Sequence, residues 1–181
     1  MPADIRAVVF DFDGVMTDNR VIVSSDGTES VIADRSDGMG IKFLRSQTAL
    51  RLLVLSTETD PVVVHRCKKL QLQCLTGVED KLPALKEWLS EISLESSSCV
   101  YVGNDINDVG CMEYAGWAIA PADAYPTALA FADLVLDRSG GRGAVRELAD
   151  LLLVHPGTAR NVSVGSKTVP DGAFEDENEI L

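Results

Sequence analysis

The feature that most constrains the fold is a regular alternation of short apolar runs with longer stretches of helical spacing. The apolar runs predict buried strands, because both faces of each run are hydrophobic; they cover residues 7–10, 52–55, 99–102, 117–120 and 134–136. Apolar residues at helical spacing predict helices over residues 40–48, 61–70, 82–92, 107–115, 126–132 and 144–153. Such alternation is typical of βαβ units with right-handed crossovers. We therefore expect an α/β fold with a Rossmann-like parallel sheet and helices on both faces.

A second pattern interrupts the alternation early in the chain. The runs Val21-Ile22-Val23 and Val31-Ile32 flank a turn that contains Gly27. This spacing predicts a β-hairpin over residues 20–33. The alternation ends near residue 154, and the remaining residues 155–181 carry scattered Gly, Ser and Pro followed by an acidic run. We expect one domain over residues 1–154 and a flexible acidic tail over 155–181.

Composition excludes several classes of protein. The net charge of −12 argues against a nucleic-acid partner, since phosphate backbones require clustered Lys and Arg. No apolar run approaches the roughly 18 residues that a transmembrane helix needs, so we expect no membrane partner. The four cysteines show no C-x-x-C spacing, which argues against zinc and against a disulfide framework. Together with the lack of an N-terminal signal pattern, this predicts a cytoplasmic protein with reduced thiols.

Polar residues follow three of the predicted buried strands. Ligands of open α/β sheets bind at the carboxyl ends of the strands, so these positions are the first to inspect. Asp11 and Asp13 follow the first strand, Ser56 follows the second, and Gly103-Asn104-Asp105 with Asp108 follow the third. Lys81 precedes a helix between the second and third of these strands.

Phosphoryl transfer requires these residue types. Asp11 can attack phosphorus and form an aspartyl-phosphate, while Asp13 can protonate the leaving oxygen and then activate water. Mg²⁺ would offset the repulsion between carboxylates and phosphate, with Asp105 as a further ligand and Asp108 behind it or sharing its role. Ser56 and Lys81 can hold the phosphate oxygens. Each residue alone is as readily explained by turn chemistry or a solvated surface, but their order beside successive strands favours the functional interpretation.

The same residues resemble the four motifs of the haloacid dehalogenase superfamily. The matching positions are Asp11-x-Asp13-Gly14-Val15-x-Thr17, Ser56, Lys81 and Gly103-Asn104-Asp105-x-Asn107-Asp108. The resemblance implies that Asp11 is the nucleophile, Asp13 the acid/base, and that Ser56 and Lys81 bind phosphate. It also implies Mg²⁺ ligation by Asp11, the backbone carbonyl of Asp13 and Asp105. It covers roughly residues 5–153.

The gaps between the motifs leave no room for a cap domain, which narrows the resemblance. The hairpin, Arg35-x-Asp37-Gly38-x-Gly40-Ile41 and Gly140-Gly141-Arg142-Gly143 resemble a tetrameric subfamily. That subfamily includes phosphatases of 3-deoxy-octulosonate 8-phosphate and of ketodeoxynononate 9-phosphate, and the C-terminal domain of some acylneuraminate cytidylyltransferases. The resemblance implies a homotetramer in which one subunit helps to close the site of the next, and a phosphorylated sugar acid as substrate.

The residues after Ser56 depart from the octulosonate phosphatases, which typically carry Gly-Arg there. This chain has Thr57-Glu58, with Arg66 and Lys69 on the following helix, which is similar to the nononate phosphatases. The resemblance therefore favours a nine-carbon substrate bound by Thr57, Glu58, Arg66, Lys69 and Asn104, although Arg66 and Lys69 also fit an ordinary solvated helix face. The alternatives are an octulosonate phosphatase or a non-catalytic oligomerisation domain. A response-regulator receiver is disfavoured, because Ser56 stands where its phospho-acceptor aspartate would be.

Overall fold

The computed structural model describes residues 2–160 and contains one six-stranded sheet in the order β5-β4-β1-β6-β7-β8. All neighbouring strands in it are parallel. The strands are β1 (Ala7–Phe10), β4 (Arg51–Leu55), β5 (Gln73–Leu75), β6 (Cys99–Val102), β7 (Trp117–Ala120) and β8 (Leu134–Val135). The predicted parallel sheet is confirmed. The chain places β4 and β5 on one side of β1, and β6, β7 and β8 on the other.

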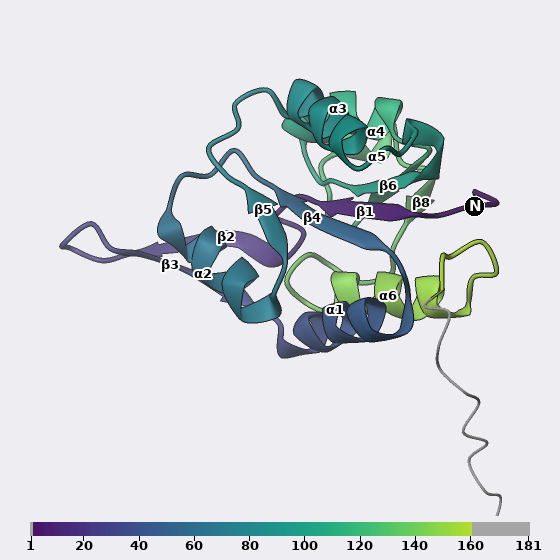
Figure 1. The fold of residues 1–181 in the computed structure, drawn as a ribbon. Helices are drawn as coiled ribbons and strands as arrows, with labels where there is room; N and C mark the ends of the chain where they lie inside the picture. The colour runs from purple at the N-terminus through teal and green to yellow at the C-terminus, as the bar shows by residue number, and fades with distance from the viewer. Residues whose placement is uncertain (1, 161–181) are drawn as a thin grey trace, which may run out of the picture.

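Helices cover both faces of this sheet (Figure 1). On one face lie α3 (Lys81–Glu91), α4 (Val109–Tyr114) and α5 (Pro126–Leu129). On the other lie α1 (Arg35–Gln47), α2 (Pro61–Leu70) and α6 (Ala144–Val154). Short 3₁₀ turns, η1 (Ser96–Ser98) and η2 (Ile106–Asp108), precede β6 and α4. The predicted α/β fold class is thereby confirmed.

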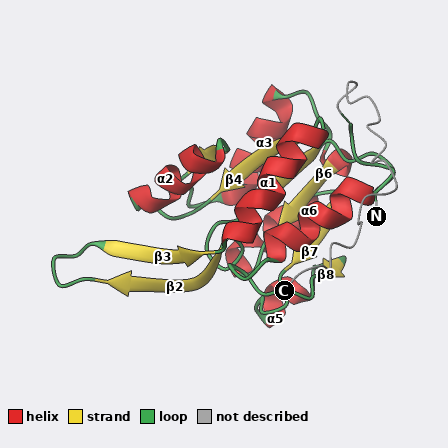
Figure 2. Cartoon of the chain, turned by 90° about the horizontal axis from the view of Figure 1, so that it is seen from below, coloured by secondary structure: helices red, strands yellow, loops and turns green. Residues whose placement is uncertain are grey.

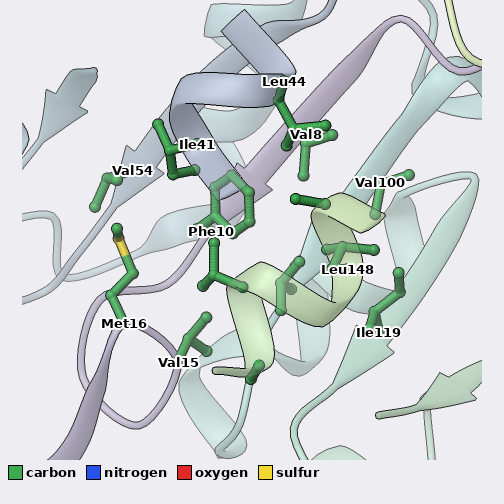
Figure 3. Packing of buried hydrophobic residues seen from close by; sticks show 14 of the residues in the cluster. Val8, Phe10, Val15, Met16, Ile41, Leu44, Val54, Val100, Ile119 and Leu148 are labelled. Carbon is green, nitrogen blue, oxygen red and sulfur yellow. The ribbon is translucent and has the colours of Figure 1, made fainter. Parts of the chain in front are cut away.

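Two hydrophobic clusters hold these layers together, one on each face of the sheet. Successive residues of β1 alternate between them, because side chains of a strand point to opposite faces. Val8 and Phe10 pack with Ile41 and Leu148 from α1 and α6 (Figure 3). Val9 belongs to the other cluster, which includes residues of α3 and α4. Burial of β1 on both faces fixes the position of the residues that follow it.

Helix α1 begins earlier than the apolar spacing predicts. It starts at Arg35 instead of residue 40, because the Asp34 carboxylate caps it by accepting a hydrogen bond from the Ser36 amide at 2.7 Å. Its glycines concealed this start. A Cβ on Gly40 would lie 3.0 Å from the Ala149 side chain, so glycine lets α1 approach α6 closely.

The hairpin is formed by β2 (Thr17–Val23) and β3 (Glu29–Ala33) and projects beyond the helical layers (Figures 1 and 2). It begins slightly before the predicted range of 20–33. Within the described residues, β1 and β4 are separated only by this hairpin and α1, so no cap domain lies there.

Residues 155–160, which we predicted to begin a flexible tail, pack against the start of the domain instead. Ile5 and Thr158 form a parallel bridge, and the Ala49 amide donates to the Ala159 carbonyl at 2.9 Å. The rest of the predicted tail, with its acidic run, lies outside the described residues. Among residues 2–160, no helix combines the length and the apolar character that a bilayer crossing requires.

Candidate active site

Three neighbouring strands end at one point of the sheet, and the polar residues singled out in the sequence follow them. Strand β1 lies between β4 and β6, with Phe10 in register with Val54 on one side and Val102 on the other. Asp11 and Ser56 therefore emerge side by side, and the loop after β6 lies on the other side of Asp11. This is the crevice at which doubly wound sheets bind ligands.

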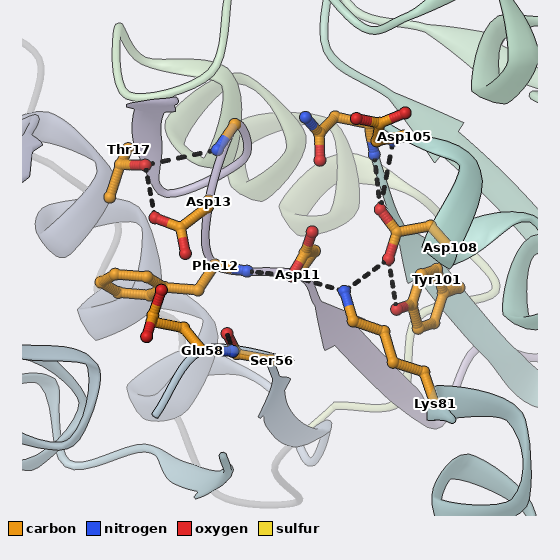
Figure 4. A network of polar contacts seen from close by, with 12 residues as sticks. Asp11, Phe12, Asp13, Thr17, Ser56, Glu58, Lys81, Tyr101, Asp105 and Asp108 are labelled. Atoms are coloured by element: carbon orange, nitrogen blue, oxygen red, sulfur yellow. Dashed lines mark hydrogen bonds and ion pairs between the residues drawn. The ribbon is translucent and has the colours of Figure 1, made fainter. Parts of the chain in front are cut away.

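Asp11 is anchored by a buried lysine (Figure 4). The Lys81 Nζ lies 2.7 Å from Asp11 Oδ1, which also accepts a hydrogen bond from the Phe12 amide at 2.7 Å. Burial, with the nearby Asp108 carboxylate, raises the pKa of Asp11 to about 8, against the opposing charge of Lys81. These two contacts are both made by Oδ1, whereas Oδ2 faces the Asn104 side chain.

Lys81 is the first residue of α3 and is only 2% exposed. Burial by itself lowers the pKa of Lys81, but the carboxylates of Asp11 and Asp108 outweigh burial and leave the pKa raised. The lysine therefore stays protonated and carries its positive charge beneath the site.

Asp108 has a different environment from the one we predicted for a metal ligand. It is fully buried, and its Oδ1 accepts from Lys81 Nζ and from the Tyr101 hydroxyl, each at 2.8 Å. Its Oδ2 accepts from the backbone amides of Asn104 and Asp105 at 2.9 and 3.3 Å. Because protein donors occupy both oxygens, Asp108 positions Lys81 and the loop after β6, and we no longer assign it to the metal.

Asp13 lies at the edge of the pocket and contacts the start of the hairpin. Its Oδ1 accepts a hydrogen bond from the Thr17 hydroxyl at 3.2 Å, and Thr17 itself is fully buried. Burial raises the pKa of Asp13, the Thr17 hydrogen bond opposes this, and the charge of Glu58 adds to it. A carboxyl with a raised pKa is suited to donating a proton.

The loop after β4 supplies a hydroxyl and a structured turn. Ser56 is 1% exposed, and its Oγ accepts from the Glu58 amide at 3.0 Å, which leaves its proton free to be donated. The Glu58 carboxylate accepts from the amides of Thr59 and Asp60 at 2.7 and 2.9 Å. Glu58 is therefore held in place by its own loop, beside the exposed Thr57.

The Asn104 side chain contacts two of the oxygen-bearing groups that the motif resemblance assigns to a metal. In the orientation that satisfies its hydrogen bonds, the Asn104 side-chain amide donates to the Asp13 backbone carbonyl at 2.9 Å and to Asp11 Oδ2 at 3.2 Å. Asp105 lines the same pocket, and its Oδ1 accepts from the Ile106 amide. Among residues 2–160, no group of three or more acidic, Cys or His side chains forms a metal cluster. Two carboxylates, one carbonyl and water nevertheless fit the preference of Mg²⁺, which retains several waters.

A cavity of about 320 Å³ opens above these residues. Asp11, Asp13, Thr57, Glu58, Asn104 and Asp105 line it as predicted, with Ser56 and Lys81 lying outside its wall. The hairpin contributes residues that sequence reasoning missed: Asn19, Arg20, Val21, Glu29 and Val31. Asp60, Val62 and Asn107 complete the lining. The sequence of the hairpin contains no ligand-binding pattern. The one signal that could have pointed to these residues is the position of the predicted hairpin close to the first motif.

Two predicted substrate-binding residues do not lie along this cavity. Arg66 extends from α2 toward the start of α1, where its Nη2 donates to the Asp34 carbonyl at 2.9 Å. Lys69 is exposed and also absent from the lining. Within one chain, Arg66 contacts the start of α1 and Lys69 faces solvent. We therefore withdraw the prediction that these two residues bind substrate in the pocket of their own subunit.

The glycines of the late Gly140-Gly141 motif pack against the active-site loop. A Cβ on Gly140 would lie 1.9 Å from the Gly14 carbonyl oxygen, and the Gly141 amide donates to the Val15 carbonyl at 3.1 Å. Any side chain at position 140 would push against the loop that carries Asp13. The motif thus maintains the geometry of the site from a distant part of the sequence.

This chain is similar to known hydrolases in sequence and in fold. Residues 66–148 match the haloacid dehalogenase-like hydrolase family. The 3-deoxy-D-manno-octulosonate 8-phosphate phosphatase of Salmonella typhi is 34% identical over 155 residues, covering 85% of this chain and 82% of the relative. The chain belongs to the haloacid dehalogenase-like hydrolases. The predicted superfamily and the predicted class of enzyme, a phosphoric monoester hydrolase, are confirmed.

Solved structures of this hydrolase family share the fold. A protein of Streptomyces avermitilis assigned to the family has a TM-score of 0.80 and 45% identity, covering 83% of this chain and 86% of that one. The 3-deoxy-D-manno-octulosonate 8-phosphate phosphatase of Moraxella catarrhalis, solved with a magnesium ion, a phosphate ion and a sugar-acid molecule, has a TM-score of 0.78 and 30% identity. The match covers 81% of this chain and 84% of the Moraxella catarrhalis chain.

Proposed function

We propose that this hydrolase removes the phosphate of a phosphorylated 2-keto-3-deoxy sugar acid through an aspartyl-phosphate on Asp11. The observation that carries the proposal is the Asp11 carboxylate itself, which is held by Lys81 at 2.7 Å at the end of β1 and borders a cavity of sugar-phosphate size. The Salmonella typhi and Moraxella catarrhalis relatives are phosphatases of such a substrate, and membership of the family supports phosphate-ester hydrolysis.

The proposed reaction has two steps, each using groups already in position. One oxygen of the Asp11 carboxylate attacks phosphorus, and the bond from phosphorus to the sugar oxygen breaks while Asp13 gives its proton to that oxygen. Asp13 then takes a proton from the water that cleaves the aspartyl-phosphate, and the enzyme returns to its starting state. Lys81 and the Ser56 hydroxyl stabilise the negative charge on the phosphoryl oxygens.

Magnesium is the cofactor that fits this site. We propose that the Asp11 carboxylate, the Asp13 carbonyl and Asp105 hold it, because these three residues line the same cavity. Bound Mg²⁺ would neutralise the charge between carboxylates and phosphate, and would keep Asp11 ionised despite its burial.

The length of the sugar acid stays a prediction. The Salmonella typhi and Moraxella catarrhalis relatives act on the eight-carbon 8-phosphate, whereas the sequence favours a nine-carbon 9-phosphate. Of the charged residues on which that preference rested, Glu58 lines the cavity, and Arg66 and Lys69 do not. Side-by-side turnover of the two phosphates under the same conditions would decide between them.

A homotetramer and a cytoplasmic location also stay predictions. Exposed apolar side chains on the hairpin support self-association: Val21, Ile22, Val23 and Ile32 are 50–61% exposed. Burial of these side chains between copies would be favourable. Light scattering at micromolar concentration measures the assembly directly, and a monomeric mass with full activity would contradict it.

The test of the proposed function is phosphate release by the wild type and by Asp11→Asn, with and without Mg²⁺. We expect the wild type to release phosphate only with the metal, and Asp11→Asn to abolish turnover while its far-UV spectrum and mass are unchanged. Asp150→Asn is a matched control, because Asp150 is an exposed partner of Arg146 on α6 and does not line the cavity. Substantial turnover by Asp11→Asn would remove this residue as the nucleophile. Failure of the wild type on every phosphorylated sugar acid, combined with tight assembly, would favour the oligomerisation domain.

A further inference from the structure

The walls of the active-site cavity carry an uneven distribution of charge. Six carboxylates line it, from Asp11, Asp13, Glu29, Glu58, Asp60 and Asp105. One cationic side chain faces them along the lining, Arg20 of the hairpin. The second positive charge of the site, on Lys81, lies beneath the phosphate end and is already paired with Asp11 and Asp108.

Arg20 is available to a ligand. It is exposed, and among residues 2–160 its guanidinium makes no hydrogen bond, ion pair or ring contact with another residue. This distinguishes it from Arg66, which donates to a backbone carbonyl, and from Arg142 and Arg146, which pair with Asp18 and Asp150. A guanidinium that borders an active-site cavity without a protein partner is free to form a bidentate pair with an anion.

A β-bulge determines where Arg20 stands. Thr17 pairs with Ala33 and Val21 with Val31, so three residues of β2 lie opposite one residue of β3. Asn19, in the middle of this bulge, has a φ of 61°, in the left-handed region that asparagine tolerates better than most residues. The bulge thereby changes the direction of the strand next to the active site.

The bulge is fastened to the catalytic machinery. The Asn19 amide donates to the Thr17 hydroxyl oxygen at 3.3 Å, and the same hydroxyl donates to Asp13. Asp18 lies 3.5 Å from Arg142, which belongs to the glycine-rich segment packed on this loop. The backbone that carries Arg20 is thus held at a fixed position relative to Asp13, as a binding residue requires.

We propose that Arg20 binds the carboxylate of the substrate and so selects phosphorylated acids over neutral sugar phosphates. This inference rests on the proposed function and names the residue that recognises the acid. The substrate carries two anionic groups, and the phosphate is placed at Asp11, Lys81 and the metal. Its carboxylate would meet strong repulsion from Glu29, Glu58 and Asp60 unless a cation accompanied it. Those carboxylates can instead accept hydrogen bonds from the sugar hydroxyls.

The experiment compares two substrates that differ only at the acid group: whichever of the eight- and nine-carbon 2-keto-3-deoxy acid phosphates the wild type turns over faster, and its C1 carboxamide. For the acid we expect Arg20→Gln to lower kcat/KM by about 10- to 100-fold, mainly through KM, the range of one charge-assisted hydrogen-bonded pair. For the carboxamide we expect a change below about twofold. Arg20→Lys keeps the charge without the planar fork and should lie between the wild type and Arg20→Gln on the acid.

Arg51→Gln is the matched control, because Arg51 is also exposed but begins β4 at the opposite end of the sheet. It should leave both substrates unaffected, and a urea unfolding midpoint should verify that Arg20→Gln is folded. Equal losses on acid and carboxamide, or no loss on the acid, would overturn the role of Arg20 while leaving the phosphatase intact. A wild type that releases phosphate from an aryl phosphate but from neither the eight-carbon nor the nine-carbon acid phosphate would refute the proposed substrate class, and with it this inference.

Discussion

Asp37 of α1 is a buried carboxyl group whose surroundings disfavour its ionised form. The residue is 1% exposed, and its Oδ1 accepts a hydrogen bond from the Arg146 amide at 2.8 Å. Its Oδ2 is buried and has no hydrogen-bond partner among residues 2–160. Burial raises the pKa of Asp37 from 3.8 to about 6, with the Arg146 amide opposing the rise and the charge of Asp34 adding to it.

This shift makes the free energy of unfolding depend on pH in a definite direction. Between the two pKa values the folded state holds a proton that the unfolded state has released, so stability falls as pH rises through this window. At about 1.4 kcal/mol per pKa unit, the shift corresponds to about 3 kcal/mol in full. About 2 kcal/mol of this lies between pH 4 and pH 7, and about 1 kcal/mol between pH 5 and pH 7, above the isoelectric point near 4.5.

Asp37→Asn removes this titration while its amide oxygen can still accept from the Arg146 amide. We therefore expect the stability of Asp37→Asn relative to the wild type to rise by about 1 kcal/mol from pH 5 to pH 7, by urea unfolding in EDTA. Asp26→Asn should show no trend over this range, because hydrogen bonds from Thr28 lower the pKa of Asp26 and its carboxyl is ionised in both the folded and the unfolded state above pH 5. Parallel pH profiles for the wild type and Asp37→Asn would refute the reasoning.

The remaining predictions concern the metal, the active-site loop and the hairpin. Asp108→Asn should destabilise the fold by about 1–3 kcal/mol in EDTA, because Lys81 and the Tyr101 hydroxyl lose a charged acceptor while Lys81 keeps its pair with Asp11. Asp105→Asn should leave stability near that of the wild type and raise the Mg²⁺ concentration needed for half-maximal activity, and equal stability losses would contradict these roles. Gly140→Ala should lower both activity and stability, the latter by about 1–3 kcal/mol from overpacking, whereas Gly27→Ala at the open hairpin tip should leave turnover unchanged. Ile22→Asp should reduce the mass measured by light scattering below that of a tetramer, and an unchanged mass would exclude the hairpin as the contact.

Much of the fold and the site was predictable because the decisive signals are local. Residues directly after β1, β4 and β6 must meet, since parallel strands place their carboxyl ends at one edge of a sheet. Asp11, Asp13 and Asn104 therefore came together as predicted, and Lys81 joined them at the start of α3. The start of α1 was predicted less well, because its glycines serve packing against α6 and weaken the helical pattern.

The sequence by itself determined the order of strands and helices, the lack of room for a cap between β1 and β4, and the positions from which we propose the chemistry at Asp11. The tertiary structure decided what each neighbouring side chain faces. Asp105 and Asp108 are similar in sequence, yet only Asp108 is surrounded by buried donors that occupy both of its oxygens. Arg20 and Arg66 are likewise both arginines near a motif, but their surroundings differ. The bulge in β2 leaves Arg20 beside the cavity, whereas Arg66 donates to the backbone carbonyl of Asp34 just before α1. Such differences depend on contacts between distant segments, which spacing along the chain does not specify.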